Sequence, residues 1–170
     1  RSGNVDFALS IREIQHASII SKKLLSAREV CVIPKKHRLA AKSTLSVYDI
    51  HNEKMIMASR TDPSYETHRA LLYKHKIHYQ KILESPFSTL SMAMIPDLNA
   101  LSINNVLIAE LVCQHNNLLT WRYVDEFVDC TDFYLSMPPW LNESPTEGLF
   151  LASFRESLKV ITQKLNINTI

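Results

Sequence analysis

The stretch that decides the fold runs from Cys31 to Ile50, "CVIPKKHRLAAKSTLSVYDI". Its first residues, preceded by Val30, predict a short buried strand, because β-branched side chains pack well on a pleated surface and Pro34 cannot continue the ladder. The basic run "PKKHRLA" predicts an exposed crossing, and "STLSVYDI" predicts a helical segment that opens with a capping hydroxyl. This pattern is typical of a chain that passes from one lobe to another.

Composition sets the broad class of protein. The 170 residues are 46% apolar and 21% charged, which suffices for one ordinary core or two small lobes. The formal net charge of +2 gives no general attraction to phosphate backbones, so this chain itself is not expected to bind nucleic acid. Neither a membrane-spanning apolar run nor the apolar core of a signal peptide is visible in the sequence. We expect a soluble, cytoplasmic protein with no membrane contact.

Strands and helices alternate along the first two thirds of the chain. Four runs predict strands: "VDFALSI", "REVCVIP", "EKMIMASRT" and "IHYQKILES". Asp62 as a cap and Pro63 as a first helical residue predict one helix, Ser85 or Ser88 begins another that Pro96 and Asp97 end, and "LNALSINNVLIAELV" predicts a strand and then a helix. This order predicts an α/β fold with mostly parallel sheets flanked by helices.

Two further segments complete the predicted organisation. The run "REIQHASIISKKLLSA" has limited periodicity and is interpreted as loop and edge structure, and "DFYLSMP" predicts a strand. After a Pro-rich loop, a terminal helix is predicted over "LFLASFRESLKVITQKL". One face of that helix carries Leu149, Phe150, Phe154, Leu158 and Ile161. Ser144 and Glu147 have capping-box spacing, but Gly148 follows directly, so the sequence does not fix the first residue of the helix.

The order of segments resembles the effector-binding (substrate-binding) domain of LysR-type transcriptional regulators. The likeness is carried by "SGNVDFAL", by "SAREVCVIPKKHRLAAKSTLSVYDI" and by "SPFSTLSMAMIPDLNALSINN". The resemblance implies a two-lobed, periplasmic-binding-protein-like fold of type II. Lobe one would hold residues 1–36 and 131–170, and lobe two would hold residues 37–130, with crossings near 30–40 and 131–138. "CVIPKKHRLA" would be the first crossing, with its basic residues simply solvated, and "DFYLSMPP" the return.

The chain departs from the family pattern in two places. Family members usually carry glycines where this chain has "PDLNA". The chain must therefore turn here without glycine, either through a longer turn or through Asn99, for example with Asn99 in a left-handed conformation. The chain also begins where the family's first lobe is already partly built, so lobe one is expected to be incomplete. The winged helix-turn-helix that binds DNA is expected to lie in a domain absent from this chain.

Polar side chains at the predicted strand ends are the candidate effector site. In open α/β sheets small molecules bind outside the carboxyl ends of strands, near helix N-termini. The candidate effector-binding residues are Ser10, Ser59, Arg60, Thr61, Ser88, Thr89 and Asn104. Together they suit a carboxylate or an amino-acid-like anion, with Arg60 as a bidentate clamp. The competing interpretation is that the hydroxyls cap helices and Arg60 is solvated.

Metal sites, cofactors and catalysis have little support in the sequence. His75 and His78 are three residues apart and His68 is nearby, but "HKIHYQ" crosses from helix to strand and completes no ligand set. No nucleophile elbow, zinc motif or carboxylate pair is present, so no catalytic residue, cofactor or metal is expected. Cys31, Cys113 and Cys130 have no pattern and are expected to be buried, reduced thiols.

Three functions are compatible with this pattern. The resemblance implies a sensing domain that binds an effector between two lobes and acts on DNA through its separate domain, as a homodimer or homotetramer. A solute-binding protein of a transport system would share the two-lobed fold. An enzyme on the same scaffold is disfavoured by the missing catalytic residues. Residues upstream of Arg1 would discriminate, because a winged helix-turn-helix indicates a regulator and a signal peptide indicates a transporter.

Overall fold

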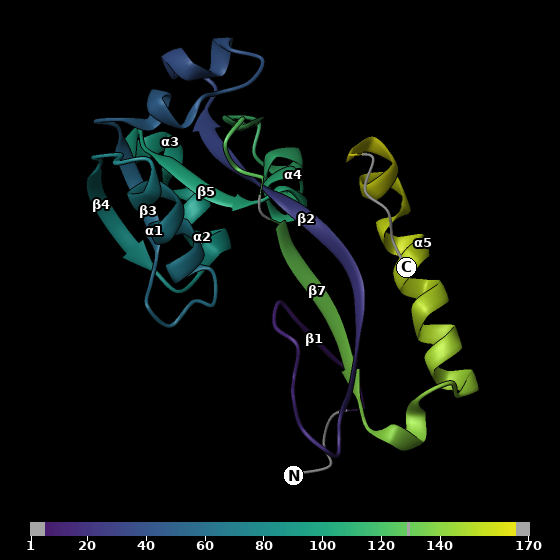
Figure 1. Cartoon of the computed structure of the whole chain (residues 1–170). Coiled ribbons are helices and arrows are strands. Elements are labelled where there is room, and N and C mark those ends of the chain that lie inside the picture. Colours follow the sequence, from purple (N-terminus) through teal and green to yellow (C-terminus); the bar gives the residue numbers. More distant parts are fainter. Residues whose placement is uncertain (1–5, 129, 166–170) are drawn as a thin grey trace. The chain divides into compact units, whose positions relative to one another are not determined.

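The chain divides into two compact units, each with its own strands and helices (Figure 1). The structure is a computed structural model that describes residues 6–128 and 130–165. The described residues up to Ala27, together with those from Thr131 onward, form the smaller unit, and Arg28–Cys130 form the larger unit. Within the described residues, no helix combines the length and the apolar character needed to cross a lipid bilayer.

The larger unit is built on a mixed sheet. Its strands are the second part of β2 (Ile20–Pro34), β3 (Lys54–Ala58), β4 (Gln80–Ser85), β5 (Leu101–Asn105) and β6 (Leu119–Tyr123). Strand β3 pairs in parallel with β4 and β5, whereas β2 pairs antiparallel with β5 and β6. The predicted α/β class is confirmed, but among the strand pairs of this unit in the described residues only β3–β4 and β3–β5 are parallel. A parallel pair of strands needs a crossover connection, which is usually a helix, and only short 3₁₀ turns separate β2 from β3. The alternation of strands and helices therefore did not predict the direction of β2.

Helices cover this sheet. Helices α1 (Tyr65–Lys74) and α2 (Ser88–Ala93) pack on β3, and α4 (Val106–His115) packs on β5 and β6. The short segments are α3 (Ile95–Leu98) and the 3₁₀ turns η1 (Arg38–Ala41) and η2 (Val47–Ile50). The cap in "STLSVYDI" is not its opening Ser43, as predicted, but Ser46, which forms a capping box with Asp49 at the start of η2.

Three other predicted helix boundaries are wrong. Asp62 is not a cap, because its carboxylate accepts hydrogen bonds from the amide and hydroxyl of Ser64, and α1 begins two residues after Pro63. Helix α2 begins at Ser88, but Phe87 holds the cap position without a side-chain hydrogen bond. Pro96 and Asp97 do not end a helix; they lie inside α3, where proline is tolerated in the first turn.

The chain turns after α3 through a left-handed residue. Asn99 has φ 46° and ψ 49°, and its amide donates to the carbonyls of Ile95 and Pro96. The left-handed conformation considered for Asn99 is therefore confirmed. Asparagine tolerates this region of φ and ψ better than other non-glycine residues, which explains how the turn forms without the glycines that the family usually carries.

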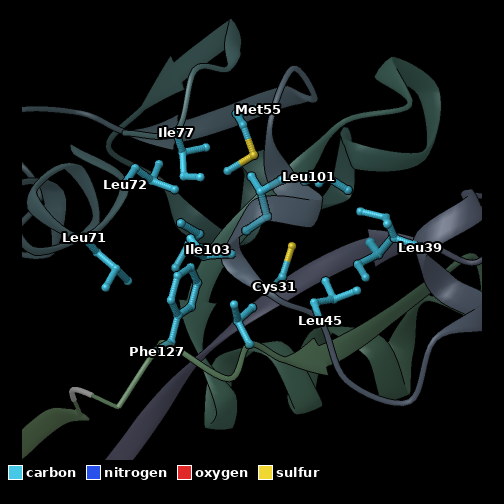
Figure 2. Packing of buried hydrophobic residues seen from close by; sticks show 14 of the residues in the cluster. Cys31, Leu39, Leu45, Met55, Leu71, Leu72, Ile77, Leu101, Ile103 and Phe127 are labelled. Carbon is cyan, nitrogen blue, oxygen red and sulfur yellow. The ribbon is translucent and has the colours of Figure 1, made fainter. Parts of the chain in front are cut away.

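The core of the larger unit is apolar and fills one face of its sheet (Figure 2). Strand residues Met55, Leu101 and Ile103 meet helix and turn residues there. Leu39 is also fully buried, so the basic stretch "PKKHRLA" is anchored to this unit although Lys35 and Lys36 are exposed. On the opposite face, Val30 and Val32 of β2 are fully buried too. Burial of both faces explains why the Val30–Ile33 part of β2 is an uninterrupted apolar run.

The smaller unit combines three strands and one long helix. Strand β7 (Cys130–Met137) lies between β1 (Ala8–Ser10) and the first part of β2, and α5 spans Pro145–Leu165. The interpretation of "REIQHASIISKKLLSA" as loop is wrong for Ile20–Ala27, which belong to β2. Polar residues from Ser21 to Lys23 hid that strand from a search for apolar periodicity. The predicted strand "VDFALSI" is shorter, and its Val5 lies outside the described residues.

Helix α5 begins earlier than its apolar pattern predicts. Glu147 donates its amide hydrogen to the Ser144 hydroxyl at 3.1 Å, so the capping position is Ser144 and Gly148 does not interrupt the helix. Phe150 stacks on Phe7 with ring centroids 4.7 Å apart and packs against Phe154. Leu149, predicted on the same apolar face, is instead 72% exposed. Its position one residue before Phe150 rotates it about 100° around the helix.

Candidate ligand-binding site

A pocket lies where the three parallel strands of the larger unit end. Because parallel strands point the same way, the carboxyl ends of β3, β4 and β5 meet at one edge, and α1 and α2 begin beside that edge. The pocket has a volume of about 240 Å³, including its opening to solvent. Its lining residues are Met57, Ala58, Ser64, His68, Ser85, Ser88, Ser91, Ser102, Ile103 and Asn104.

Several lining hydroxyls are already used by the protein. Ser91 donates to the carbonyl of Phe87 at 2.9 Å, and Ser64 donates to Asp62 at 2.6 Å. Ser102 accepts from the Asn104 amide nitrogen at 3.0 Å, which orients the Asn104 side chain. Among the described residues, the Ser88 hydroxyl has no hydrogen-bond partner. Ser88 and the Asn104 amide oxygen are therefore the groups best placed to bind a ligand.

A buried contact between His68, which lines the pocket, and Glu29 lies beside it. His68 Nε2 lies 3.0 Å from a carboxylate oxygen of Glu29, and the side chains are only 4% and 3% exposed. Glu29 comes from β2 and His68 from α1, so the pair ties these two elements together. Buried charged groups are rare unless paired, so this contact explains why a buried glutamate is tolerated directly before the apolar run Val30–Ile33 of β2.

The structure brings together only part of the predicted site. Ser88 and Asn104 line the pocket. Ser59 bonds to Thr61 at 2.8 Å, and neither lines the pocket. Thr89 is exposed and also outside the lining. Ser10 belongs to the smaller unit, where its hydroxyl donates to the Arg12 carbonyl at 2.7 Å.

The predicted anion clamp is also placed differently. Arg60 is exposed and is not among the lining residues. Nearby, a hydrogen bond from Lys81 is the main cause that lowers the pKa of Glu84, and the Arg60 backbone contributes. Arg60 therefore lies next to a carboxylate that already has a cationic partner.

Sequence reasoning missed four serines and one buried contact. Ser64, Ser91 and Ser102 belong to no sequence motif. Ser85 was considered only as a helix cap and His68 only as a metal ligand. A usable signal did exist for Glu29, because this acidic residue directly precedes the apolar run Val30–Ile33 in the same strand. A buried glutamate needs a partner, and α1, the helix that follows β3, supplies His68.

The positions of the cysteines and histidines bear on thiol reactivity and metal binding. Cys31 is fully buried, and burial, aided by the charge of Glu53, raises the pKa of its thiol to about 12. Cys130 is exposed, which contradicts its predicted burial. It is the first residue of β7. In the part of the chain that the structure describes, no three His, Cys, Asp or Glu side chains gather to hold a metal ion.

Solved structures share this fold. The LysR family transcriptional regulator HinK from Pseudomonas aeruginosa superposes with a TM-score of 0.75 at 18% identity, over 92% of this chain and 54% of that chain. The Synechocystis PCC6803 CcmR regulatory domain, in complex with 2-PG, superposes with a TM-score of 0.68 at 18% identity, over 94% of this chain and 74% of that chain. The BenM effector-binding domain with benzoate superposes with a TM-score of 0.67 at 17% identity, over 96% of this chain and 72% of that chain. The chain thus has the α/β, type II periplasmic-binding-protein-like fold of such effector-binding domains.

Sequence comparison names the family. The family described as "LysR substrate binding domain" matches residues 1–159. The chain therefore belongs to the LysR substrate-binding domain family, and the predicted resemblance is confirmed. The transcriptional activator protein LysR of Escherichia coli (strain K12) is 34% identical over 87 residues, which are 51% of this chain and 28% of the activator. The chain thus spans under a third of that relative, and the transport alternative is not favoured.

Proposed function

We propose that this chain senses a small-molecule effector for a LysR-type regulator and binds it in the pocket at the ends of β3, β4 and β5. The observation that carries the proposal is the set of unused polar groups on Ser88 and Asn104 at the carboxyl edge of a parallel sheet. Solved structures with this fold support it, because the CcmR regulatory domain is in complex with 2-PG, the effector-binding domain of QuiR with shikimate and that of BenM with benzoate.

Effector binding would then control a separate domain. We propose that a winged helix-turn-helix outside this chain binds DNA, and that effector binding shifts the population of its active arrangement. The regulator would act in the cytoplasm as a homodimer or homotetramer, without catalytic activity of its own. The lobe boundaries at residues 36–37 and 130–131 stay predictions, as do the roles of Ser10, Ser59, Arg60, Thr61 and Thr89.

The test is a thermal-shift screen against small carboxylates, amino acids and aromatic acids. A ligand that binds only the folded state raises the melting temperature by mass action. We expect at least one compound to stabilise the wild type, and we expect Ser88→Ala and Asn104→Ala to weaken that shift.

The adjacent Thr89 provides the matched control. It is exposed and outside the pocket lining, so Thr89→Ala should leave the shift unchanged. A compound that stabilises the wild type, Ser88→Ala and Asn104→Ala equally would place the effector elsewhere and would overturn the proposed pocket.

A further inference from the structure

Two buried polar side chains near the end of β5 are bonded to each other in the pocket lining. Ser102 and Asn104 are 5% and 9% exposed, and both line the pocket. Side chains alternate between the two faces of a strand, so these two share a face, opposite Leu101 and Ile103 of the apolar core. The Asn104 amide nitrogen donates to Ser102 Oγ at 3.0 Å. The bond makes the two side chains one hydrogen-bonding unit of the pocket.

This bond decides which polar positions of the pair are left for a ligand. Ser102 Oγ accepts from Asn104, and the Ser102 hydroxyl hydrogen has no acceptor within the described residues. Asn104 Oδ1 can only accept, and no donor of the described residues reaches it. Among these residues, the one side-chain nitrogen or oxygen that is both fully enclosed and unpaired is Asn142 Oδ1, so Asn104 Oδ1 is in contact with solvent. The pair therefore offers one donor and one acceptor.

The two free positions are close enough for a single ligand atom to use both. The nitrogen and oxygen of a carboxamide are about 2.2 Å apart, which puts Asn104 Oδ1 at most about 5.2 Å from Ser102 Oγ. A hydrogen bond between two oxygens spans about 2.7–2.8 Å. One ligand oxygen can therefore accept from Ser102 and donate to Asn104 at the same time.

The chemistry of the ligand group decides whether both positions are filled. A hydroxyl oxygen accepts one hydrogen and donates its own, which matches the pair. An ionised carboxylate accepts from Ser102 but has no hydrogen for Asn104, and an ammonium group donates to Asn104 but cannot accept from Ser102. A methylene group fills neither position and leaves both polar atoms without a partner, which is costly.

We propose that the pocket selects a small molecule that carries a hydroxyl group, and that this hydroxyl binds between Ser102 Oγ and Asn104 Oδ1. The inference rests on the proposed pocket and adds the functional group by which that pocket distinguishes its effector. A site that pairs with a ligand hydroxyl rejects the analogue without it, because its own polar groups are then left unpaired. The hydroxylated ligand is expected to bind about tenfold or more tightly than that analogue.

The other serines of the lining do not provide this discrimination. Ser91 donates its hydrogen to the Phe87 carbonyl at 2.9 Å, and Ser85 accepts from the Phe87 amide at 3.1 Å. The Ser88 hydroxyl can rotate to pair with a donor or with an acceptor, so it does not distinguish between them. Selection for a hydroxyl is therefore assigned to the bonded pair.

The experiment compares ligands that differ at one substituent. Lactate, propionate and alanine carry a hydroxyl, a hydrogen or an ammonium group at the same carbon, and glycolate, acetate and glycine form a second such set. All six share a carboxylate, so differences within a set report on the substituent. Affinities for the full chain are measured at one pH by NMR titration of the backbone amides of Ser88, Ser102 and Asn104. Lactate and glycolate should bind about tenfold or more tightly than the other members of their sets.

Variants test whether the bonded pair is the cause. Ser102→Ala removes the donor and Asn104→Ala removes the acceptor, so each should bring the ratio of lactate to propionate affinity close to one. Ser43 is exposed and outside the pocket lining, so Ser43→Ala is the matched control and should leave the ratio unchanged. The NMR spectrum of each variant reports whether its fold is kept, and the second variant keeps the test decisive if the first one unfolds.

Failure of this inference can be told apart from failure of the pocket. If propionate or alanine shifts the three amides with the affinity of lactate, or if the ratio survives in both variants, the hydroxyl inference is wrong and the pocket stands. If no member of either set shifts these amides, the pocket does not take small acids or amino acids, and both proposals fall.

Discussion

The two units of the chain are stabilised by different kinds of contact. The larger unit has a continuous apolar core in which Leu101 and Phe127 are fully buried. The smaller unit has few fully buried apolar residues, and its strands and helix are joined by polar contacts that include Lys22–Glu147 and Lys23–Asp132, each at 2.8 Å. The comparison shows that the smaller unit adds these polar contacts to a smaller set of buried apolar residues, which includes Leu25 and Leu135.

This difference matters for the proposed site. The pocket lies entirely within the unit that has the larger core, so its lining residues are held on strands whose other side chains are fully packed. A site on packed strands keeps its geometry when the ligand is absent, which lowers the entropic cost of binding. The smaller unit, with more of its contacts exposed to water and salt, is expected to respond more strongly to solution conditions.

The largest effect should come from opening the apolar core. Phe127→Ala should lower the free energy of unfolding of the larger unit by about 3–5 kcal/mol, because it removes buried surface and leaves a cavity. Urea denaturation followed by Trp121 fluorescence in a Trp140→Phe background reports on this unit. Phe87, which is 66% exposed, is the matched control, and Phe87→Ala should cost under about 0.5 kcal/mol. Equal losses for both would contradict a burial-dominated unit.

A smaller loss is expected when one ion pair of the smaller unit is broken. Glu147 is buried, accepts a hydrogen bond from the Glu143 amide and pairs with Lys22. Lys22→Met should cost about 1–3 kcal/mol, because it leaves a buried carboxylate short of a partner. Hydrogen exchange of α5 peptides should show the loss. The exposed pair Lys159–Glu156 is the control, since Lys159→Met should change exchange very little.

Acid should act on the same contacts. The hydrogen bond from Lys22 is the main cause that lowers the pKa of Glu147, and the bonds from Lys23 and Ser26 lower the pKa of Asp132. A carboxylate with a lowered folded-state pKa stabilises the fold above its unfolded pKa, about 3.9 for Asp and 4.3 for Glu. That contribution is lost as pH falls through the folded pKa.

Exchange measured from neutral pH down to about pH 3 should therefore show the smaller unit losing protection below the unfolded carboxyl pKa values. The loss attributable to Glu147 should not exceed that of Lys22→Met, because protonation removes the same pair. In Lys22→Met the acid-induced change should shrink. An unchanged acid response in that variant would show that other groups control it.

The sequence predicted the larger unit better than the smaller one, for a physical reason. Strands such as "EKMIMAS" are buried and carry an apolar pattern, so periodicity finds them, and parallel strand ends locate the edge where Ser88 and Asn104 meet. The contacts of Glu29 with His68 and of Lys22 with Glu147 join residues far apart in sequence. Their spacing carries no local signal, so the pair beside the pocket and the polar strand Ile20–Ala27 were missed.

The smallest effect is expected on the outer face of α5. Leu149 and Val160 are 72% and 73% exposed, so their apolar character does little for the packing of this unit. Leu149→Gln should change the free energy of unfolding by less than about 0.5 kcal/mol, as surface substitutions usually do. Leu141→Gln, at a buried position of the same unit, should cost several times more. If Leu149→Gln were equally destabilising, this helix face would be buried in solution, and the smaller unit would depend on an apolar contact in addition to the contacts that the structure shows.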